Sequence, residues 1–383
     1  MKNSTYYILS LLLVVIFNVT SSAQISTNAT IVSGGLVREY RIYKPASYTG
    51  NTPVPLLLNF HGYTSNNLQQ EIYANFNTIA DTANFLVVLP NGTIDAQGST
   101  FWNVFNGPYA VDDIGFVRNL LDTLQTLYNI DANRIYSTGM SNGGFMSHTL
   151  ACELHDRIAA IAAVAGTITN SYMNNCNPPR PIPVMHIHGT ADDVVPYTGL
   201  TLVNGLSVQN TVDKWVDKNN CNPTPAQTNV PNTSTTDGCT AERYVYGGGD
   251  NGTTVELYKI VGGGHTWPGA FFPIGVTNQD INASREIWRF LSKYRLDELS
   301  PSAEIASAAF SFEMTPNPAH GQFTVQGDFS QLHIFHSNGQ LVQQRENIVG
   351  NTVFNVESWQ KGLYFVQVTT AEGRVGTRKL IVE

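Results

Sequence analysis

Residues 134–144, RIYSTGMSNGG, contain the pattern that decides the fold. Apolar and polar residues alternate before the glycines, as at the end of a β-strand, and apolar residues then recur at helical spacing through 145–154. The strand therefore passes into a helix through GMSNG at 139–143, which matches the G-x-S-x-G pattern of a sharp strand-to-helix turn. Such a turn strains the serine backbone and exposes its hydroxyl, so Ser141 is the candidate nucleophile.

The backbone around this turn offers donors for a developing negative charge. The N–H of Asn142 is expected at the start of the helix, where unpaired amides and the helix dipole favour an oxyanion. A second donor is expected after the apolar run at 54–60, where His61-Gly62 lets the backbone approach a substrate and the N–H of Tyr63 is our candidate. Alternatively, His61-Gly62 only turns the chain.

A G-x-S-x-G pattern alone is equally compatible with a structural turn, so a nucleophile needs an acid and a base downstream. In PVMHIHGTADDVVPY, a strand is expected over 184–188, and the turn after it carries Asp192, the candidate acid, with Asp193 as the alternative. In VELYKIVGGGHTWPG, a strand over 255–261 and three glycines lead to His265, the candidate base. The chain order of serine, acid and histidine, each at a strand end, favours a catalytic triad.

The first three quarters of the chain alternate strands with helices. Continuous apolar runs such as 54–60 and 158–164 predict strands that are buried on both faces. Helical periodicity predicts helices at 69–83, 112–128, 203–218 and 280–294. This alternation predicts an α/β fold, a mostly parallel sheet with helices on both faces, whose ligand site lies at the carboxyl ends of the strands.

Composition divides the chain into four expected parts. Residues 1–23 combine an early lysine, an apolar run shorter than the ~20 residues of a bilayer crossing, and a small-residue cleavage site, which predicts a secretory signal peptide. A catalytic domain at 24–299 and a small polar linker at 300–310 follow. Short alternating strands over 311–383 predict a separate β-sandwich. No segment is expected to span a membrane.

Charge and cysteine content restrict the partners and the compartment. The 21 basic residues against 29 acidic ones give a net charge of −8 with no basic patch, which argues against a nucleic-acid partner. Four cysteines in an exported chain favour disulfides, although three connectivities are possible. We expect Cys152 to pair with Cys176, and Cys221 to pair with Cys239 across a polar loop.

No cofactor or metal site is expected. His186 and His188 form an H-x-H pattern on the strand before the candidate acid, but no third ligand lies nearby in the sequence. His148 and His155 lie on the predicted helix after Ser141, where they are expected to be packed or exposed.

Three aromatic residues are candidates for the substrate pocket. Trp267 follows His265 by two positions and is equally compatible with lining an acyl pocket and with plain packing. Trp102 and Tyr197 are further pocket candidates.

From about residue 36 to 296 the chain resembles secreted polyhydroxybutyrate depolymerases and feruloyl or acetylxylan esterases, which are α/β-hydrolases of the carbohydrate esterase family 1 type. The matching segments are LLLNFHGYTSN, VDDIGFVRNLLD, RIYSTGMSNGGFMSHTLACE, HIHGTADDVVPY and GGGHTWPG. By this resemblance, Ser141, Asp192 and His265 correspond to the family triad, and the α/β-hydrolase fold is implied. The polymer-binding domain that many polymer depolymerases carry is not visible.

From Met314 onward the chain resembles the C-terminal sorting domain of the type IX secretion system. The PNP turn at 316–318, the KGLYF segment at 361–365 and the closing KLIV segment at 379–382 carry this resemblance. It implies that the type IX machinery is a partner and that the protein passes through the periplasm to the cell surface or beyond.

Together, the triad pattern and the resemblance imply a secreted serine esterase whose ester substrate is linked to a polysaccharide or a polyester. Feruloyl or acetyl groups on plant cell-wall xylan are the first expectation, because the catalytic domain is single. Hydrolysis of polyhydroxybutyrate or of hydroxybutyrate oligomers is the second. The third is a non-catalytic binding protein on a hydrolase scaffold.

Overall fold

The computed structural model describes residues 26–105, 111–299, 312–337, 340–371 and 375–383. The expected signal peptide at 1–23 and the expected linker at 300–310 lie outside the described residues. The chain separates into two compact units, Met1–Leu299 and Ser300–Glu383. No helix among the described residues is long and apolar enough to cross a bilayer.

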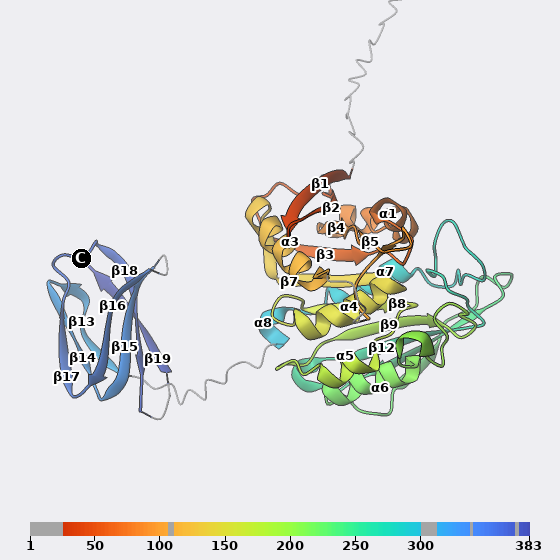
Figure 1. Ribbon diagram of the computed structural model, residues 1–383. Coiled ribbons are helices and arrows are strands. Elements are labelled where there is room, and N and C mark those ends of the chain that lie inside the picture. Colours follow the sequence, from red (N-terminus) through yellow and green to blue (C-terminus); the bar gives the residue numbers. More distant parts are fainter. Residues whose placement is uncertain (1–25, 106–110, 300–311, 338–339, 372–374) are drawn as a thin grey trace, which may run out of the picture. The chain divides into compact units, whose positions relative to one another are not determined.

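The first unit is built on a ten-stranded sheet with the order β1-β2-β4-β3-β7-β8-β9-β12-β11-β10 (Figure 1). The six strands from β4 to β12 in this order are parallel, and antiparallel strands complete both edges. This confirms the predicted mostly parallel sheet. Its strands are β1 Thr27–Ser33, β2 Leu36–Tyr43, β3 Val54–Phe60, β4 Leu86–Pro90, β7 Ile130–Met140, β8 Ala160–Val164, β9 Val184–Gly189, β10 Ala226–Asn229, β11 Thr240–Tyr246 and β12 Val255–Val261. A separate two-stranded sheet pairs β5 Thr93–Ile94 with β6 Thr100–Phe101.

Helices cover both faces of this sheet. They are α1 Asn67–Ala74, α2 Asn77–Ala83, α3 Asp113–Leu127, α4 Asn142–Glu153, α5 Asn170–Asn175, α6 Val208–Lys218, α7 Ala283–Leu291 and α8 Leu296–Leu299, with 3-10 turns η1 Thr201–Val203 and η2 Asp250–Gly252. Helices α3, α4, α5 and α6 share one buried cluster with the sheet, and α1, α2, α7 and α8 share another.

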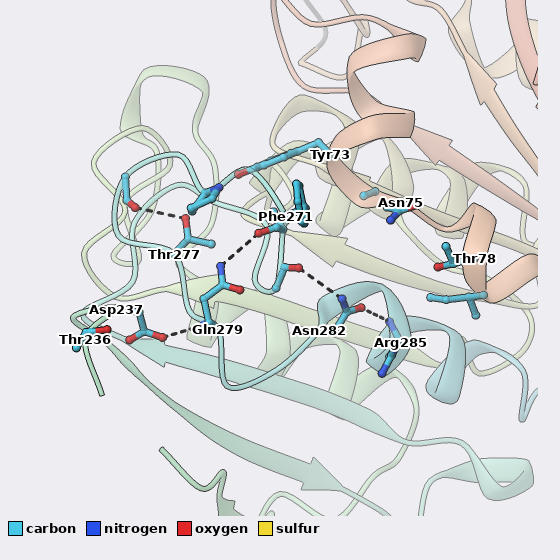
Figure 2. Close-up of a pocket in the computed structure, with 16 residues that line it drawn as sticks. Tyr73, Asn75, Thr78, Thr236, Asp237, Phe271, Thr277, Gln279, Asn282 and Arg285 are labelled. Carbon is cyan, nitrogen blue, oxygen red and sulfur yellow. Dashed lines mark hydrogen bonds between the residues drawn. The ribbon is translucent and has the colours of Figure 1, made fainter. Parts of the chain in front are cut away.

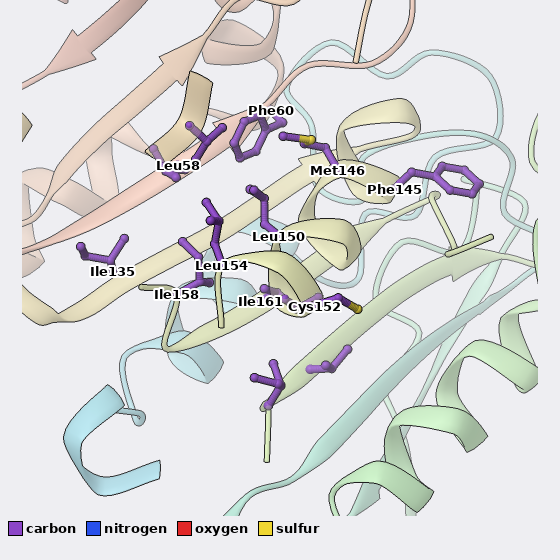
Figure 3. Packing of buried hydrophobic residues seen from close by; sticks show 14 of the residues in the cluster. Leu58, Phe60, Ile135, Phe145, Met146, Leu150, Cys152, Leu154, Ile158 and Ile161 are labelled. Carbon is purple, nitrogen blue, oxygen red and sulfur yellow. The ribbon is translucent and has the colours of Figure 1, made fainter. Parts of the chain in front are cut away.

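Strand β3 shows how the sequence produces these two layers. All seven of its residues are buried. Leu56 and Leu58 belong to the cluster that holds α4, while Leu57, which lies between them in the strand, belongs to the opposite cluster. Figure 3 shows the side chains of the first cluster packed between α4 and the sheet. A strand with two apolar faces needs a helix layer on each side.

Three predicted helices have different bounds in the structure. The expected helix at 69–83 is two helices, because Asn75 adopts a left-handed conformation with φ 45° and donates its N–H to Glu71 O, which ends α1. The expected helix at 203–218 begins only at Val208, where the side chain of Ser207 caps it. The last helix begins after Asn282 for the same reason.

Asp112 and Asp113, at the start of α3, make different contacts. Asp112 caps the helix, accepting the Gly115 N–H at 2.7 Å, as its position in the sequence predicts. Asp113 is buried and pairs with Arg38 at 2.6 Å. The pair joins α3 to β2 across the edge of the sheet, which the sequence analysis missed.

One of the two expected disulfides is present. Cys152 at the end of α4 is bonded to Cys176 after α5, which confirms that pairing. The predicted pairing of Cys221 with Cys239 is wrong, and both are free. Cys239 directly precedes β11, whereas Asn222, next to Cys221, bonds Gly247 beyond the other end of that strand. A seven-residue strand spans roughly 20 Å, and a disulfide requires Cα atoms within about 7 Å.

The second unit is all β, as predicted. Its strands are β13 Glu313–His320, β14 Gln322–Gln326, β15 Phe329–His336, β16 Leu341–Ile348, β17 Asn351–Asn355, β18 Gly362–Thr369 and β19 Val375–Val382. β13 pairs with β14 on one side and with β19 on the other, so it joins two groups of strands. Phe323 and Phe354 from one group share a buried cluster with Leu332 and Val366 from the other, which is the core of a sandwich.

Candidate active site

Ser141 occupies a strained turn between β7 and α4. Its backbone angles are φ 56° and ψ −122°, a conformation that a side chain other than glycine rarely adopts. The flanking glycines leave room for this turn: a Cβ on Gly139 would lie 2.4 Å from Gly143 O, and a Cβ on Gly143 would lie 2.2 Å from Phe60 O. Both positions therefore require glycine, and the turn holds Ser141 at the carboxyl end of β7.

The Ser141 side chain opens into a cavity of about 540 Å³. His265 and Gly62 line the same cavity. Most of the remaining wall is apolar or aromatic and comes from α1, from the end of β7 and from the loop after His265: Ile72, Tyr73, Met140, Phe272 and Ile274. The serine hydroxyl is thus placed beside a hydrophobic recess.

The structure brings Asp192, and not Asp193, to the candidate base. Asp192 Oδ2 lies 2.8 Å from His265 Nδ1, and Asp192 is buried. Its other oxygen accepts the backbone N–H groups of Val194 at 2.9 Å and Val195 at 2.8 Å. Asp193 is exposed to solvent. The turn after β9 therefore aims one carboxylate at His265 and fixes it with two backbone donors.

This contact sets the protonation of the histidine. Burial by itself favours a protonated Asp192, but the contacts with His188 and His265 outweigh it and hold the pKa of Asp192 below its usual range. The ionised carboxylate accepts the proton on His265 Nδ1, which leaves the lone pair of Nε2 for a proton from Ser141. Within the described residues the Ser141 hydroxyl makes no hydrogen bond; in unliganded sites the contact with the base often tightens only when substrate binds.

The two expected oxyanion donors belong to residues that follow Ser141 and Gly62 in the sequence. Asn142 is the first residue of α4, where the N–H has no partner within the helix. Its side chain is anchored by two hydrogen bonds to the backbone of Trp102. Tyr63 follows Gly62, at which an added Cβ would lie 3.4 Å from Ser141 Cβ. The arrangement is compatible with acyl transfer from an ester to Ser141.

The predicted aromatic pocket residues do not line this cavity, and those three predictions are wrong. Trp267 is 1% exposed, packs edge-on against Phe76 and donates its indole N–H to Ser284. Trp102 is fully buried and donates to His61 O. Tyr197 packs against His188, on the other side of the acid. Trp267 and Trp102 are therefore part of the core, and Tyr197 is partly buried against it.

The sequence analysis missed the loop that supplies the apolar wall. Phe272 and Ile274 line the cavity although 61% and 65% of their surface is exposed. The FFPI run at 271–274 was a usable signal, because large apolar residues beside proline in a loop lack the periodicity of a packed element.

Several histidines are buried and neutral. His61 donates from Nδ1 to Gly62 O at 2.7 Å and accepts the Gly92 N–H at Nε2, so it stiffens the candidate oxyanion loop, and burial lowers its pKa to about 4. Burial also lowers the pKa of His148 to about 3 and that of His186 well below its usual value. The described residues contain no group of three or more potential metal ligands.

These neutral histidines predict a loss of stability in mild acid. Below pH ~6.5 each histidine of the unfolded chain binds a proton that the fold excludes, down to about pH 4 for His61, so acid favours unfolding. Each contributes up to about 1.4 kcal/mol per pH unit to the decline in the unfolding free energy. We expect urea unfolding at pH 7.5, 6.5 and 5.5 to show the decline below pH 6.5.

Carboxylates contribute little to this slope, because they titrate at lower pH in the unfolded chain. A His155→Gln variant is the matched control, since His155 is only half-buried, and it should keep the slope. An unfolding free energy that stays constant from pH 7.5 to 5.5 would show that the buried histidines are not kept neutral.

Comparisons with known proteins identify relatives of both units. Residues 112–214 match the phospholipase/carboxylesterase family model, and residues 313–383 match the secretion system C-terminal sorting domain model. A bifunctional acetylxylan esterase/xylanase from Neocallimastix patriciarum is 29% identical over 265 residues, 69% of this chain and 34% of its own. Feruloyl esterase B from Piromyces equi is 33% identical over 232 residues, 58% of this chain and 41% of its own.

Feruloyl esterase D from Neurospora crassa is 27% identical over 272 residues, which cover 68% of this chain and 83% of that protein. The chain thus spans less than half the length of the first two relatives and most of the third. Among solved structures, an acetyl xylan esterase from Aspergillus awamori aligns with 70% of this chain and 99% of its own, at 15% identity and a TM-score of 0.49.

Proposed function

We infer that this chain, an α/β-hydrolase related to feruloyl and acetylxylan esterases and ending in a secretion-system sorting domain, is an exported serine esterase. The observation that carries this proposal is the 2.8 Å contact between Asp192 Oδ2 and His265 Nδ1 at the cavity of Ser141. It supports a histidine that is poised to accept a proton from the serine.

The proposed reaction is acyl transfer in two steps. Ser141 Oγ attacks the ester carbonyl while His265 Nε2 takes its proton, and the protonated His265, oriented by Asp192, then donates that proton to the leaving alcohol. Water repeats the sequence on the acyl-enzyme and releases the acid. The N–H groups of Asn142 and Tyr63 would hold the oxyanion, and losing one such donor costs about 3 kcal/mol in the barrier.

The cavity favours an aromatic acyl group over acetyl. Its volume of about 540 Å³ exceeds what an acetyl group fills, and the aromatic residues Tyr73 and Phe272 line it together with Ser141. A hydroxycinnamoyl group such as feruloyl has a planar ring that can pack against these side chains. We therefore propose feruloylated plant polysaccharides as the substrate class.

The second unit accounts for export. Its match to a secretion-system sorting domain supports delivery of the hydrolase to the cell surface or beyond, where plant polymers are met. We propose that the type IX machinery is the partner that recognises it.

Three substrates tested side by side examine this proposal: methyl ferulate, acetylated xylan and polyhydroxybutyrate. We expect kcat/KM to be highest for methyl ferulate, lower for acetylated xylan, and no release from polyhydroxybutyrate, because only the first fills the apolar cavity. Preference for polyhydroxybutyrate or for acetyl groups would reject the acyl assignment but keep the esterase. Absence of hydrolysis of every ester would reject the esterase itself.

A further inference from the structure

A second cavity, of about 760 Å³, is shown in Figure 2. Tyr73 lines both cavities. The loop after His265 also divides them, because Phe272 and Ile274 line the catalytic cavity while Phe271 and Pro273 line the second. The two cavities therefore share Tyr73 and the loop at 271–274 as a common boundary.

The two cavities differ in chemistry. Aromatic and aliphatic side chains dominate the wall beside Ser141, whereas amide, hydroxyl, carboxylate and guanidinium groups surround the second cavity. Those groups belong to Asn75, Thr78, Asp237 and Arg285, together with others on the loop before α7. Such a mixture of donors and acceptors suits the hydroxyl groups of a sugar, and the ring of Phe271 offers a surface for its C–H face.

Part of this polar wall is held in place and part is open for binding. Asp237 accepts the Gln279 backbone N–H at 2.8 Å, and Gln279 Nε2 donates to Ala270 O, so these side chains are preorganised (Figure 2). The Arg285 side chain is exposed and forms no ion pair within the part of the chain that the structure describes. A free guanidinium at the rim of a polar cavity can bind vicinal hydroxyls or a sugar carboxylate.

We propose that the second cavity binds the carbohydrate part of the ester, while the acyl group enters the apolar cavity beside Ser141. This assignment rests on the proposed esterase function. It explains why the cavity beside Ser141 is apolar and the second cavity is polar. The feruloyl group of a feruloylated polysaccharide is aromatic, whereas its sugar part carries hydroxyl groups.

The test compares one acyl group on two alcohols. In Arg285→Ala, we expect the loss of kcat/KM on feruloylated xylo-oligosaccharide to exceed the loss on methyl ferulate by about tenfold, equivalent to about 1.4 kcal/mol. Arg118→Ala is the matched control, because Arg118 is a partly exposed arginine on α3 that pairs with Asp156, away from both cavities. It should leave both rates unchanged. Equal losses on the two esters in Arg285→Ala would overturn the subsite.

A binding measurement separates this proposal from the esterase proposal. Unmodified xylotetraose has no ester, so its binding does not depend on catalysis. We expect calorimetry to detect binding that is weakened about tenfold by Arg285→Ala and not by Arg118→Ala. An inactive protein that still shows this pattern would reject only the esterase, and an active protein without it would reject only the subsite.

A different observation carries a second inference, about the histidines behind the acid. Four buried rings connect α6, α4 and β9: Trp215, His148, His186 and His188. Trp215 Nε1 lies 3.1 Å from His148 Nδ1, His148 Nε2 lies 3.4 Å from His186 Nδ1, and His186 Nε2 lies 3.0 Å from His188 Nδ1. His188 Nε2 ends this histidine chain 2.8 Å from Val195 O.

The two ends give the histidine chain a direction. The indole N–H of Trp215 can only donate, and the carbonyl of Val195 can only accept. Each neutral histidine between them therefore carries its proton on Nε2 and accepts at Nδ1. Burial disfavours a charged ring at His148 and His186 and lowers the pKa of both.

The last ring of the histidine chain meets the acid. His188 Nε2 lies 3.3 Å from Asp192 Oδ2, the same oxygen that contacts His265. Val195, whose carbonyl accepts the His188 proton, donates its own N–H to Asp192 Oδ1 at 2.8 Å. His188 therefore supports the carboxylate both directly and through the turn that carries it.

We propose that the histidine chain is a positioning device, in which Trp215 sets the direction of the hydrogen bonds and His188 presents an N–H to Asp192. No member touches the reacting atoms. Without this direction, His188 could turn a lone pair toward the carboxylate, which would repel it.

The other titratable groups around His188 come from β12 and from the segment after β9. Lys259 on β12 is its neighbour in register and pairs with Glu242 on β11. Tyr197 meets the ring edge-on, and Asp193 is turned to solvent. The expected pH effects can therefore be attributed to the histidine chain and to the Asp192–His265 pair.

Nitrogen-15 NMR on the intact chain tests the direction, because it distinguishes the two neutral tautomers. We expect the neutral rings of His148, His186 and His188 to carry the proton on Nε2. In Trp215→Phe, which removes the indole donor together with part of the buried ring, a second tautomer should appear. A protonated ring or an Nδ1–H tautomer in the wild type would overturn the proposal.

The pH profile of kcat/KM tests the link to the triad. When His188 no longer donates an N–H to Asp192, the carboxylate interacts more strongly with protonated His265. We therefore expect the acid limb of the pH profile of kcat/KM in Trp215→Phe to move to higher pH, by roughly half a pH unit or more. Trp288→Phe is the matched control, because Trp288 stacks on Phe85 in the opposite cluster. A purely structural role would lower stability without moving the acid limb, and that result would also reject the proposal.

Discussion

Ser141→Ala is expected to abolish ester hydrolysis. The variant removes the only protein atom that the proposed mechanism uses as a nucleophile, and loss of that atom from a serine triad lowers kcat by about a millionfold. The fold should persist, because Ser141 Oγ has no hydrogen bond within the described residues and the strain lies in the backbone, which alanine shares. Burst release of p-nitrophenol from its acetate is the direct measurement.

The Ser141 prediction needs a control that removes a hydroxyl elsewhere. Ser47→Ala deletes an exposed hydroxyl that only contacts Asn84, and it should leave the burst intact. Circular dichroism would show whether Ser141→Ala is folded. A folded Ser141→Ala protein that keeps the burst would place the nucleophile at another residue and refute the proposed triad.

Asp192→Asn is expected to lower kcat by about 10⁴-fold, the scale seen when the acid of another serine triad is replaced by its amide. The new amide oxygen can still accept the backbone N–H groups of Val194 and Val195, so the turn should keep its shape. The amide N–H₂ would then face His265 Nδ1 and force the ring proton onto Nε2, where it blocks the transfer from Ser141.

Asp193→Asn is the matched control for this substitution. It makes the same chemical change one residue away, on a side chain that is exposed, and kcat should stay within about twofold of the wild type. Steady-state rates on methyl ferulate or p-nitrophenyl acetate provide the comparison. If Asp193→Asn were the damaging substitution, the acid would have to be reassigned.

Much of the site could be predicted because its signals are local in sequence. Gly139 and Gly143 flank Ser141 at the two positions where a Cβ would collide with backbone atoms, so the pattern itself reports the turn. The apolar run of β3 predicts a strand buried on both faces for a similar reason, since each of its residues needs a partner. The residues that carry each of these signals lie close together in the sequence, so a local pattern is enough to predict the feature.

Other features depend on contacts between distant segments. Asp192 and Asp193 are chemically equal neighbours, and only the direction of the turn after β9 brings one of them to His265. The pairing of Cys221 with Cys239 failed because β11 holds the two apart, although they bracket one loop in the sequence. Trp267 follows His265 closely, yet its ring turns into the core.

The amino-acid sequence by itself determined the class of fold, the strained turn at Ser141 and the order of the candidate triad, because strand and helix periodicity and the need for glycine are properties of short segments. Only the tertiary structure decided which carboxylate meets His265, which residues form the apolar wall, and that Trp215 and three histidines connect to the acid. These depend on how side chains that lie far apart in the sequence are packed by helices α4 and α6 against β9, and no local pattern encodes that packing.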